Sequence, residues 1–170
     1  MNEYPGQPLD MKLFQKTFIV CAMIPMILFM MTFVLWFMLE DPVGPGAAVP
    51  VLQIAIFGAV ALGVVLFAPG LRAKLLSVSG PVNMKNGARL EGDLAAQQRV
   101  SMAAVVGMSL AEIPLLLGFV LGFLSMSWTP YIPFAALSVA GWAYMYPRPA
   151  QIREWYERQM ASASTPGAAN

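Results

Sequence analysis

An acidic residue inside an apolar segment is the feature of this sequence that could carry chemistry. Glu112 lies near the middle of the apolar segment 100–124. A carboxyl group at bilayer depth costs about 2.5–3.5 kcal/mol on insertion scales, so it faces protein or water and marks a candidate functional site. Two roles stay open. Glu112 carries protons by gaining and losing one, or it stays protonated and ties helices together through a hydrogen bond to Ser109, Ser138 or Thr32.

Other kinds of catalysis lack the residues they need. The sequence has no His and a single Cys, Cys21, which lies in an apolar run. His is the commonest metal ligand and general base, and a lone Cys makes neither a disulfide framework nor a metal cluster. The sequence also has no glycine-rich phosphate loop. We therefore expect no enzyme activity, no cofactor and no metal site.

The composition predicts a chain embedded in a lipid bilayer. Of the 170 residues, 58% are hydrophobic and 11% are charged, and the mean hydropathy is +0.65. Soluble domains carry about 25% charged residues. The net charge of +1 would not attract nucleic acid, so we expect no nucleic-acid partner. In lipid each spanning segment must be a helix, because its backbone groups have to be satisfied within the segment.

Four apolar segments come close to or exceed the roughly 20 residues that cross a hydrocarbon core: 17–39, 51–68, 100–124 and 128–146. They predict an all-α integral membrane protein, with four transmembrane helices in a bundle and one domain over residues 1–170. The terminal segments 1–10 and 161–170 are polar or rich in small residues, and we expect both to be disordered tails.

All ten Lys and Arg residues fall on one side of these spans. They precede the first span, lie between the second and third, or follow the fourth: Lys12, Lys16, Arg72, Lys74, Lys85, Arg89, Arg99, Arg148, Arg153 and Arg158. The opposite loops contain Glu40 and Asp41 but no basic residue. The positive-inside rule therefore predicts that both termini are cytoplasmic, and we expect the inner (cytoplasmic) membrane of a bacterium.

A short amphipathic helix is predicted after the fourth span, between Ala150 and Met160. Its apolar residues recur at helical spacing: Ile152, Trp155, Tyr156 and Met160. We expect this helix to lie on the inner leaflet, and a solvated tail helix is the alternative. In the loop between the second and third spans, Asn86-Gly87 is a strong turn signal.

Small residues gather on one face of the third span. At 100° per residue they fall within a narrow arc: Ala103, Gly107, Ala111, Pro114, Gly118 and Gly122. The second span has a comparable set: Ala55, Gly58, Ala59 and Gly63. Small residues let helix backbones approach closely, so we expect the second, third and fourth helices to pack along these faces. Glu112 points about 130° away from the ridge on the third span, toward another helix or a partner subunit.

The helix that bears the acid reads Ala111-Glu112-Ile113-Pro114-Leu115-Leu116-Leu117-Gly118-Phe119-Val120. It resembles the carboxylate-bearing helix of rotary ATPase proteolipids, the c or K subunits, in which the acid is followed by apolar residues and then Gly. With Gly58-Ala59-Val60-Ala61-Leu62-Gly63 as the other arm of the hairpin, the resemblance covers residues 51–124. The resemblance implies that Glu112 carries an ion.

Two functions fit these features. The first is a non-enzymatic subunit or assembly factor of a larger membrane complex, with other membrane proteins or further copies of itself as partners. It rests on the small-residue faces and on the shortage of reactive groups. The second is a small proton-coupled carrier or channel component that uses Glu112. Substituting Glu112 separates the two, because only the second function needs the acid to release its proton.

Overall fold

The computed structural model describes residues 11–40, 46, 48–84, 87 and 89–164. These residues are mostly helical, and the helices are α1 (Met11–Glu40), α2 (Val51–Ser77), α3 (Gly92–Ser125), α4 (Trp128–Met145) and α5 (Pro149–Ser164). The predicted all-α class is confirmed in this part of the chain, apart from a small hairpin. The predicted tail 1–10 and the last part of the other tail, 165–170, lie outside the described residues.

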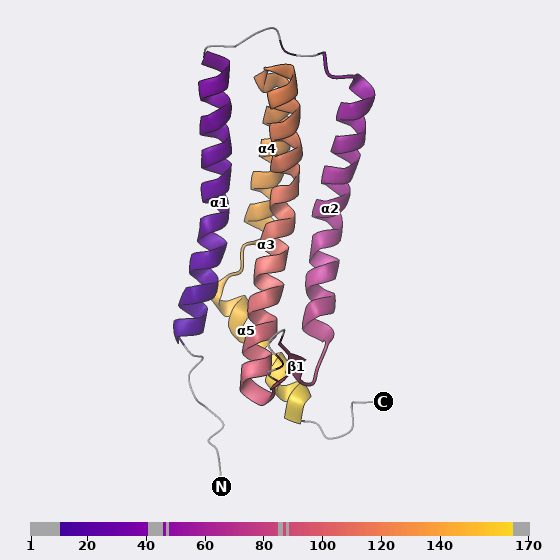
Figure 1. Cartoon of the computed structure of the whole chain (residues 1–170). Helices are drawn as coiled ribbons and strands as arrows, with labels where there is room; N and C mark the ends of the chain where they lie inside the picture. The colour runs from indigo at the N-terminus through magenta and orange to yellow at the C-terminus, as the bar shows by residue number, and fades with distance from the viewer. Residues whose placement is uncertain (1–10, 41–45, 47, 85–86, 88, 165–170) are drawn as a thin grey trace.

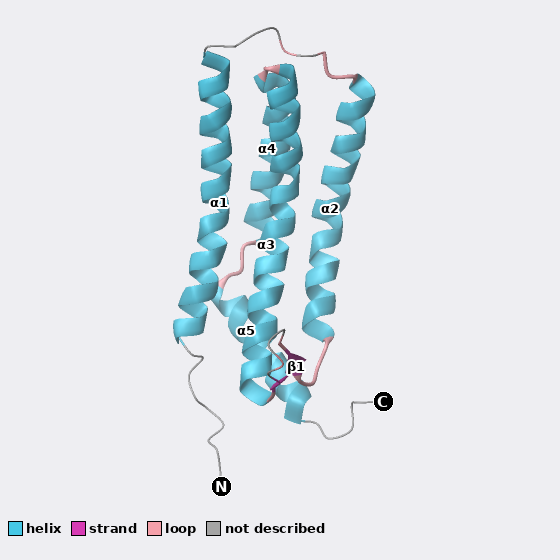
Figure 2. Ribbon diagram, viewed as in Figure 1, coloured by secondary structure: helices cyan, strands magenta, loops and turns pink. Residues whose placement is uncertain are grey.

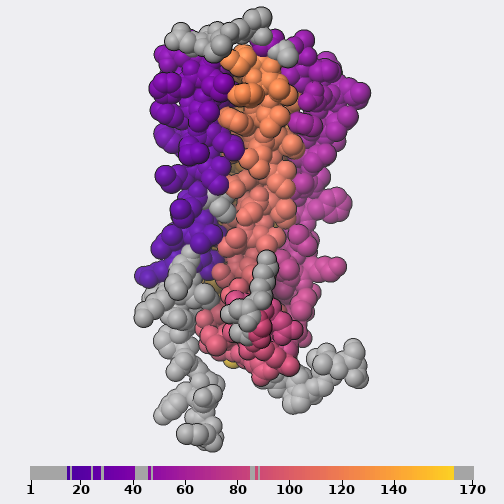
Figure 3. Space-filling view, in the orientation of Figure 1, coloured from indigo at the N-terminus to yellow at the C-terminus, as the bar shows by residue number. Residues whose placement is uncertain are grey.

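The long helices run side by side around α3. In Figure 1, α1 and α2 flank α3 and α4 lies behind it, and Figure 2 shows the same view by secondary structure. The space-filling view places α1 and α2 on opposite sides of α3 (Figure 3). α3 packs against all four other helices. The central helix of the bundle is therefore the one that carries Glu112.

Three helices are long and apolar enough to cross a membrane: the Thr17–Glu40 part of α1, α2 and α3. Within their most apolar windows, 44% of α3 is buried, against 12% for α1 and 11% for α2. α4 has 18 residues, with aromatic side chains and prolines near its start, and is not among these three helices. The bundle thus encloses α3 and leaves most of α1 and α2 to be covered by lipid or by another protein.

The predicted spans 51–68 and 100–124 are parts of longer helices, and the predicted start of the C-terminal tail at residue 161 is wrong. α2 continues past residue 68, through Pro69, to Ser77, and α3 begins at Gly92 rather than at residue 100. α5 packs on the extension of α3 and continues to Ser164, so residues 161–164 are helical and not disordered. Hydropathy alone did not reveal these contacts between polar segments.

A small β-hairpin joins α2 to α3. Its strands, β1 (Val82–Asn83) and β2 (Arg89–Leu90), pair antiparallel. The N–H of Gly87 donates to the C=O of Met84 at 3.0 Å, and Gly87 has a φ of +81°, which a residue with a Cβ rarely adopts. The turn signal at Asn86-Gly87 marked the right place, although Asn86 itself lies outside the described residues.

Three apolar clusters hold the helices together, and each is centred on a fully buried side chain of α3. The cluster around Met108 joins α1, α2, α3 and α4. The cluster around Leu115 joins α1, α3 and α4, and the cluster around Leu121 joins α2, α3 and α4. α3 is therefore the element that sets the positions of the other three long helices.

Candidate functional site

The small-residue ridge of α3 packs as predicted. All its members are buried: Ala103, Gly107, Ala111, Pro114, Gly118 and Gly122. A Cβ added at Gly118 would overlap the Cβ of Phe134 on α4. A Cβ added at Gly122 would lie 3.0 Å from Cδ2 of Leu35 and 3.1 Å from Cβ of Tyr131. These glycines let α1 and α4 approach α3 closely.

The matching prediction for α2 is wrong within this chain. A Cβ added at Gly58 or Gly63 would meet nothing within 4 Å, and Ala55 and Ala59 are exposed. α2 instead packs through its opposite side, where Ala61 and Ala68 are buried. Small size permits a close approach but does not select which face is used, and here the side of α2 that carries Ala61 and Ala68 meets α3 and α4.

Glu112 lies on the face of α3 that meets α1. Met108 and Leu115, one turn before and one turn after it, pack in clusters with Cys21 and Leu35 of α1. The Oε1 atom of Glu112 is buried and has no hydrogen-bond partner among the described residues. Burying a carboxyl oxygen without a hydrogen-bond partner costs free energy. A hydrogen bond from Oε1 to another described residue therefore does not account for the presence of this acid.

The three partners expected for Glu112 make no hydrogen bond to this oxygen. Ser138 on α4 is buried and donates to the backbone carbonyl of Ala111 at 2.7 Å. The hydroxyl of Thr32 is paired with the hydroxyl of Tyr131 at 2.5 Å. Ser109 is exposed. Ser138 and Thr32 therefore tie helices together directly, α4 to α3 and α1 to α4, without the acid.

Sequence analysis missed a second unpartnered polar group in the same part of the bundle. The indole Nε1 of Trp142 on α4 is buried and has no hydrogen-bond partner in the described part of the chain. Trp142 packs against the cluster that contains Cys21 and Met108, so it belongs to the α1–α3–α4 contact on which Glu112 also lies. The sequence feature that could have identified Trp142 is its position four residues after Ser138, which places both side chains on the same face of α4.

A polar donor and a polar acceptor without partners are groups that a water molecule or an ion can satisfy. Glu112 is the acidic residue among them, and the described residues contain no group of three His, Cys, Asp or Glu side chains that could hold a metal. The chemistry that this arrangement can support is the uptake and release of a proton by Glu112.

α5 packs on the extended end of α3, so part of its predicted apolar face contacts protein. Ile152 and Gln159 are 4% and 5% exposed. The Gln159 amide donates to the Leu76 carbonyl on α2, and the Tyr156 hydroxyl donates to the Asp93 carboxylate on α3. Burial and this hydrogen bond raise the pKa of Tyr156 to about 12, so the hydroxyl stays protonated and can donate at neutral pH. The extended ends of α2 and α3 provide the surface that α5 contacts.

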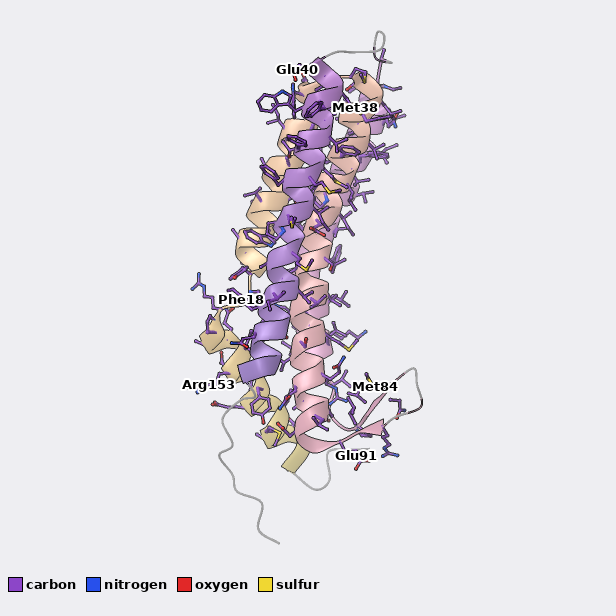
Figure 4. All side chains as sticks on the ribbon, turned by 60° about the vertical axis from the view of Figure 1, so that its left-hand side comes forward. Phe18, Met38, Glu40, Met84, Glu91 and Arg153 are labelled. Atoms are coloured by element: carbon purple, nitrogen blue, oxygen red, sulfur yellow. The ribbon has the colours of Figure 1, made fainter. Side chains whose placement is uncertain are left out.

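Basic residues collect at the end of the bundle that carries α5 and the hairpin. In Figure 4, Arg153, Met84 and Glu91 lie at this end, whereas Met38 and Glu40 lie at the other. The described helices and strands also bring Arg72, Lys74, Arg89, Arg99, Arg148 and Arg158 to this end. The predicted one-sided distribution therefore holds for the described residues, and Lys85 lies outside them.

Glu112 and the basic end are thus the two chemically distinctive regions of the described chain. Glu112 is half-buried, with its Oε1 atom unpartnered among the described residues, and the basic end is a set of arginines and lysines at one end of the bundle. Comparisons with protein-family models, with curated proteins and with solved structures find no match to this chain.

Proposed function

We propose that this protein is a non-enzymatic, four-span subunit or assembly factor of a larger membrane complex. The observation that supports this proposal is the unused small-residue face of α2. Ala55 and Ala59 are exposed, and nothing among the described residues lies within 4 Å of a Cβ added at Gly58 or Gly63. A face of this kind admits another helix at short distance. A helix of another membrane protein, or of a second copy of this chain, fits there.

In the proposed complex α1, α2, α3 and α4 all cross the bilayer. At 1.5 Å per residue the 18 residues of α4 span about 27 Å, close to the roughly 30 Å of the hydrocarbon core. α4 also packs along α3 through Phe134 and Ser138, so it shares the depth of a helix that is long enough to span. The positive-inside rule places the basic end in the cytoplasm and the protein in the inner membrane of a bacterium.

Labelling of single cysteines tests this topology. Cys21 is buried, so the parent protein provides a low background. Ala48→Cys, in an exposed position between α1 and α2, should react with a membrane-impermeant maleimide in intact cells. Asn83→Cys and Ser162→Cys, both exposed at the basic end, should react only after the cells are opened. Reaction of Asn83→Cys in intact cells would reverse the proposed orientation.

Copurification from native membranes tests the role of α2. Gly63→Leu should leave the protein folded, because nothing within 4 Å opposes the new side chain, but should reduce copurification of a partner about tenfold or more. Ala143→Leu is the matched control, since it adds similar bulk at an exposed position of α4. If both variants retain their partners at the parent level, the α2 face contacts lipid and the proposed interface is wrong.

The second candidate function is a proton-coupled carrier or channel component. The unpartnered Oε1 of Glu112 favours it, because a carboxyl group that only ties helices together needs a partner. The resemblance of residues 51–124 to rotary ATPase proteolipids supports the same role for this acid.

A further inference from the structure

A groove lies between the end of α2 and the outer side of α5. Its volume is about 610 Å³, within the 300–1,000 Å³ typical of ligand pockets. Residues of two helices far apart in the sequence line it: Pro69, Arg72, Ala73, Leu76 and Ser77 from α2, and Trp155, Arg158, Ala161 and Ser162 from α5. The groove exists because α5 lies across the extension of α2, so neither helix alone would form it.

Arg72 is fixed in place in this groove. Its Nη1 donates to the carbonyl of Met145 at 3.1 Å, and its guanidinium carbon lies 4.9 Å from the centre of the Trp155 ring. No carboxylate of a described residue forms an ion pair with it. A guanidinium group has five N–H donors, so most of those of Arg72 remain available to an anion. A pre-positioned arginine binds an anion at a lower entropic cost than a mobile one.

Arg158 adds a second positive charge from α5. It pairs with Glu154 at 2.5 Å, but both side chains are exposed, where such a pair contributes little. The hydroxyls of Ser77 and Ser162 donate to carbonyls of their own helices, those of Lys74 and Arg158, so the two guanidinium groups are the principal donors to an anion. The lining residues include no acid. The groove therefore favours a negatively charged group.

The apolar surroundings distinguish this groove from a site for a soluble anion. Leu66, just before the groove and on the same side of α2, is 68% exposed. The 27 residues of α2 extend over about 40 Å, which is longer than the hydrocarbon core, so its last turns reach the headgroup region. Trp155 suits this level, because tryptophan concentrates at membrane interfaces. An acyl chain beside Leu66 would continue directly from a phosphate held in the groove.

We propose that this groove binds an anionic phospholipid of the cytoplasmic leaflet, with its phosphate between Arg72 and Arg158 and an acyl chain along the exposed side of α2. Basic pockets on the cytoplasmic side of membrane helices bind such headgroups, and each Lys or Arg contributes about fivefold in affinity. The assignment of this site to the cytoplasmic leaflet rests on the orientation proposed above. It does not depend on a partner at Gly63 or on a proton-carrying role for Glu112.

Native mass spectrometry of the full chain in neutral detergent tests the site without reference to orientation. Phosphatidylglycerol should bind at least tenfold more tightly than phosphatidylcholine with the same acyl chains. Arg158→Gln and Arg72→Gln should each weaken phosphatidylglycerol binding about fivefold. Arg153→Gln is the matched control, because it removes the same charge from an exposed position of α5 that does not line the groove, and it should leave the affinity unchanged.

Three results would overturn the proposal. Equal binding of the two lipids would exclude a site selective for anionic headgroups, and an equal loss in Arg153→Gln and Arg158→Gln would show attraction by general surface charge. Displacement of phosphatidylglycerol by an equal concentration of inorganic phosphate would identify a plain anion site with no contribution from the acyl chain. Arg158→Gln keeps the test decisive if Arg72→Gln fails to fold, because Arg158 is exposed and holds no helix in place.

Discussion

Replacing Gly118 by Leu should prevent α3 and α4 from packing and lower the free energy of unfolding by about 3 kcal/mol. Even a Cβ at this position would overlap the Cβ of Phe134 and lie 3.2 Å from the carbonyl oxygen of Tyr131. The backbone carbonyl and the Cβ cannot move aside as a flexible side chain can, so the two helices must separate. Thermal unfolding in detergent, together with the fraction of monodisperse protein, measures the effect.

Gly63→Leu is the control for this prediction. It makes the same exchange in another long apolar helix, α2, but nothing among the described residues lies within 4 Å of the added Cβ. Its unfolding temperature should match that of the parent. If Gly118→Leu also unfolds like the parent, α4 does not pack on the ridge of α3, and the central contact of the described fold is wrong.

Replacing Glu112 by Leu should stabilise the protein by about 2 kcal/mol, even though it removes the acid on which the second candidate function depends. The Oε1 of Glu112 is buried with no hydrogen-bond partner among the described residues. A carboxyl group at bilayer depth costs about 2.5–3.5 kcal/mol on insertion scales, and leucine avoids that cost. Unfolding of the purified variants by heat or by a denaturing detergent measures the change.

Ser138→Ala gives the matched contrast. The Ser138 hydroxyl donates to the Ala111 carbonyl, so its removal should destabilise the protein by about 0.6 kcal/mol and by no more than about 1.7 kcal/mol. A loss in Glu112→Leu as large as that in Ser138→Ala would mean that the acid ties helices together after all. The comparison is useful because the two residues lie in the same bundle but differ in whether they have a partner.

Glu112→Gln then separates the two proposed functions. Glutamine keeps the size of the side chain and an amide that can hydrogen-bond, but it cannot release a proton. In cells that depend on the protein, Gln should abolish function if Glu112 carries protons and should leave function near the parent level if the protein is a structural subunit. Reaction of the parent with a carboxyl-directed carbodiimide is the independent measurement, because this reaction needs a protonated acid that is reachable from lipid. A Glu112 that does not react would count against the proton-carrying case.

The sequence by itself determined the class of the protein and the properties that run along single segments. Apolar length and the low content of charge predicted the long helices, and three of them are long and apolar enough to cross a membrane. Spacing at 100° per residue located the buried ridge that includes Gly107, Gly118 and Gly122. These features were accessible because each depends on the order of residues within one helix, and helical geometry is the same wherever the helix lies.

Only the tertiary structure decided which faces meet. Gly58 and Gly63 had the same local signal as the ridge of α3, yet nothing among the described residues lies within 4 Å of a Cβ added at either glycine. The partners expected for Glu112 were chosen because they lie at a similar depth along their spans. Ser138 nevertheless forms its hydrogen bond to a backbone carbonyl instead. Rotation of each helix about its axis depends on how all the side chains pack at once, and no single segment contains that information. The groove at Arg72 has the same origin, because its two walls come together only when α5 lies across the end of α2.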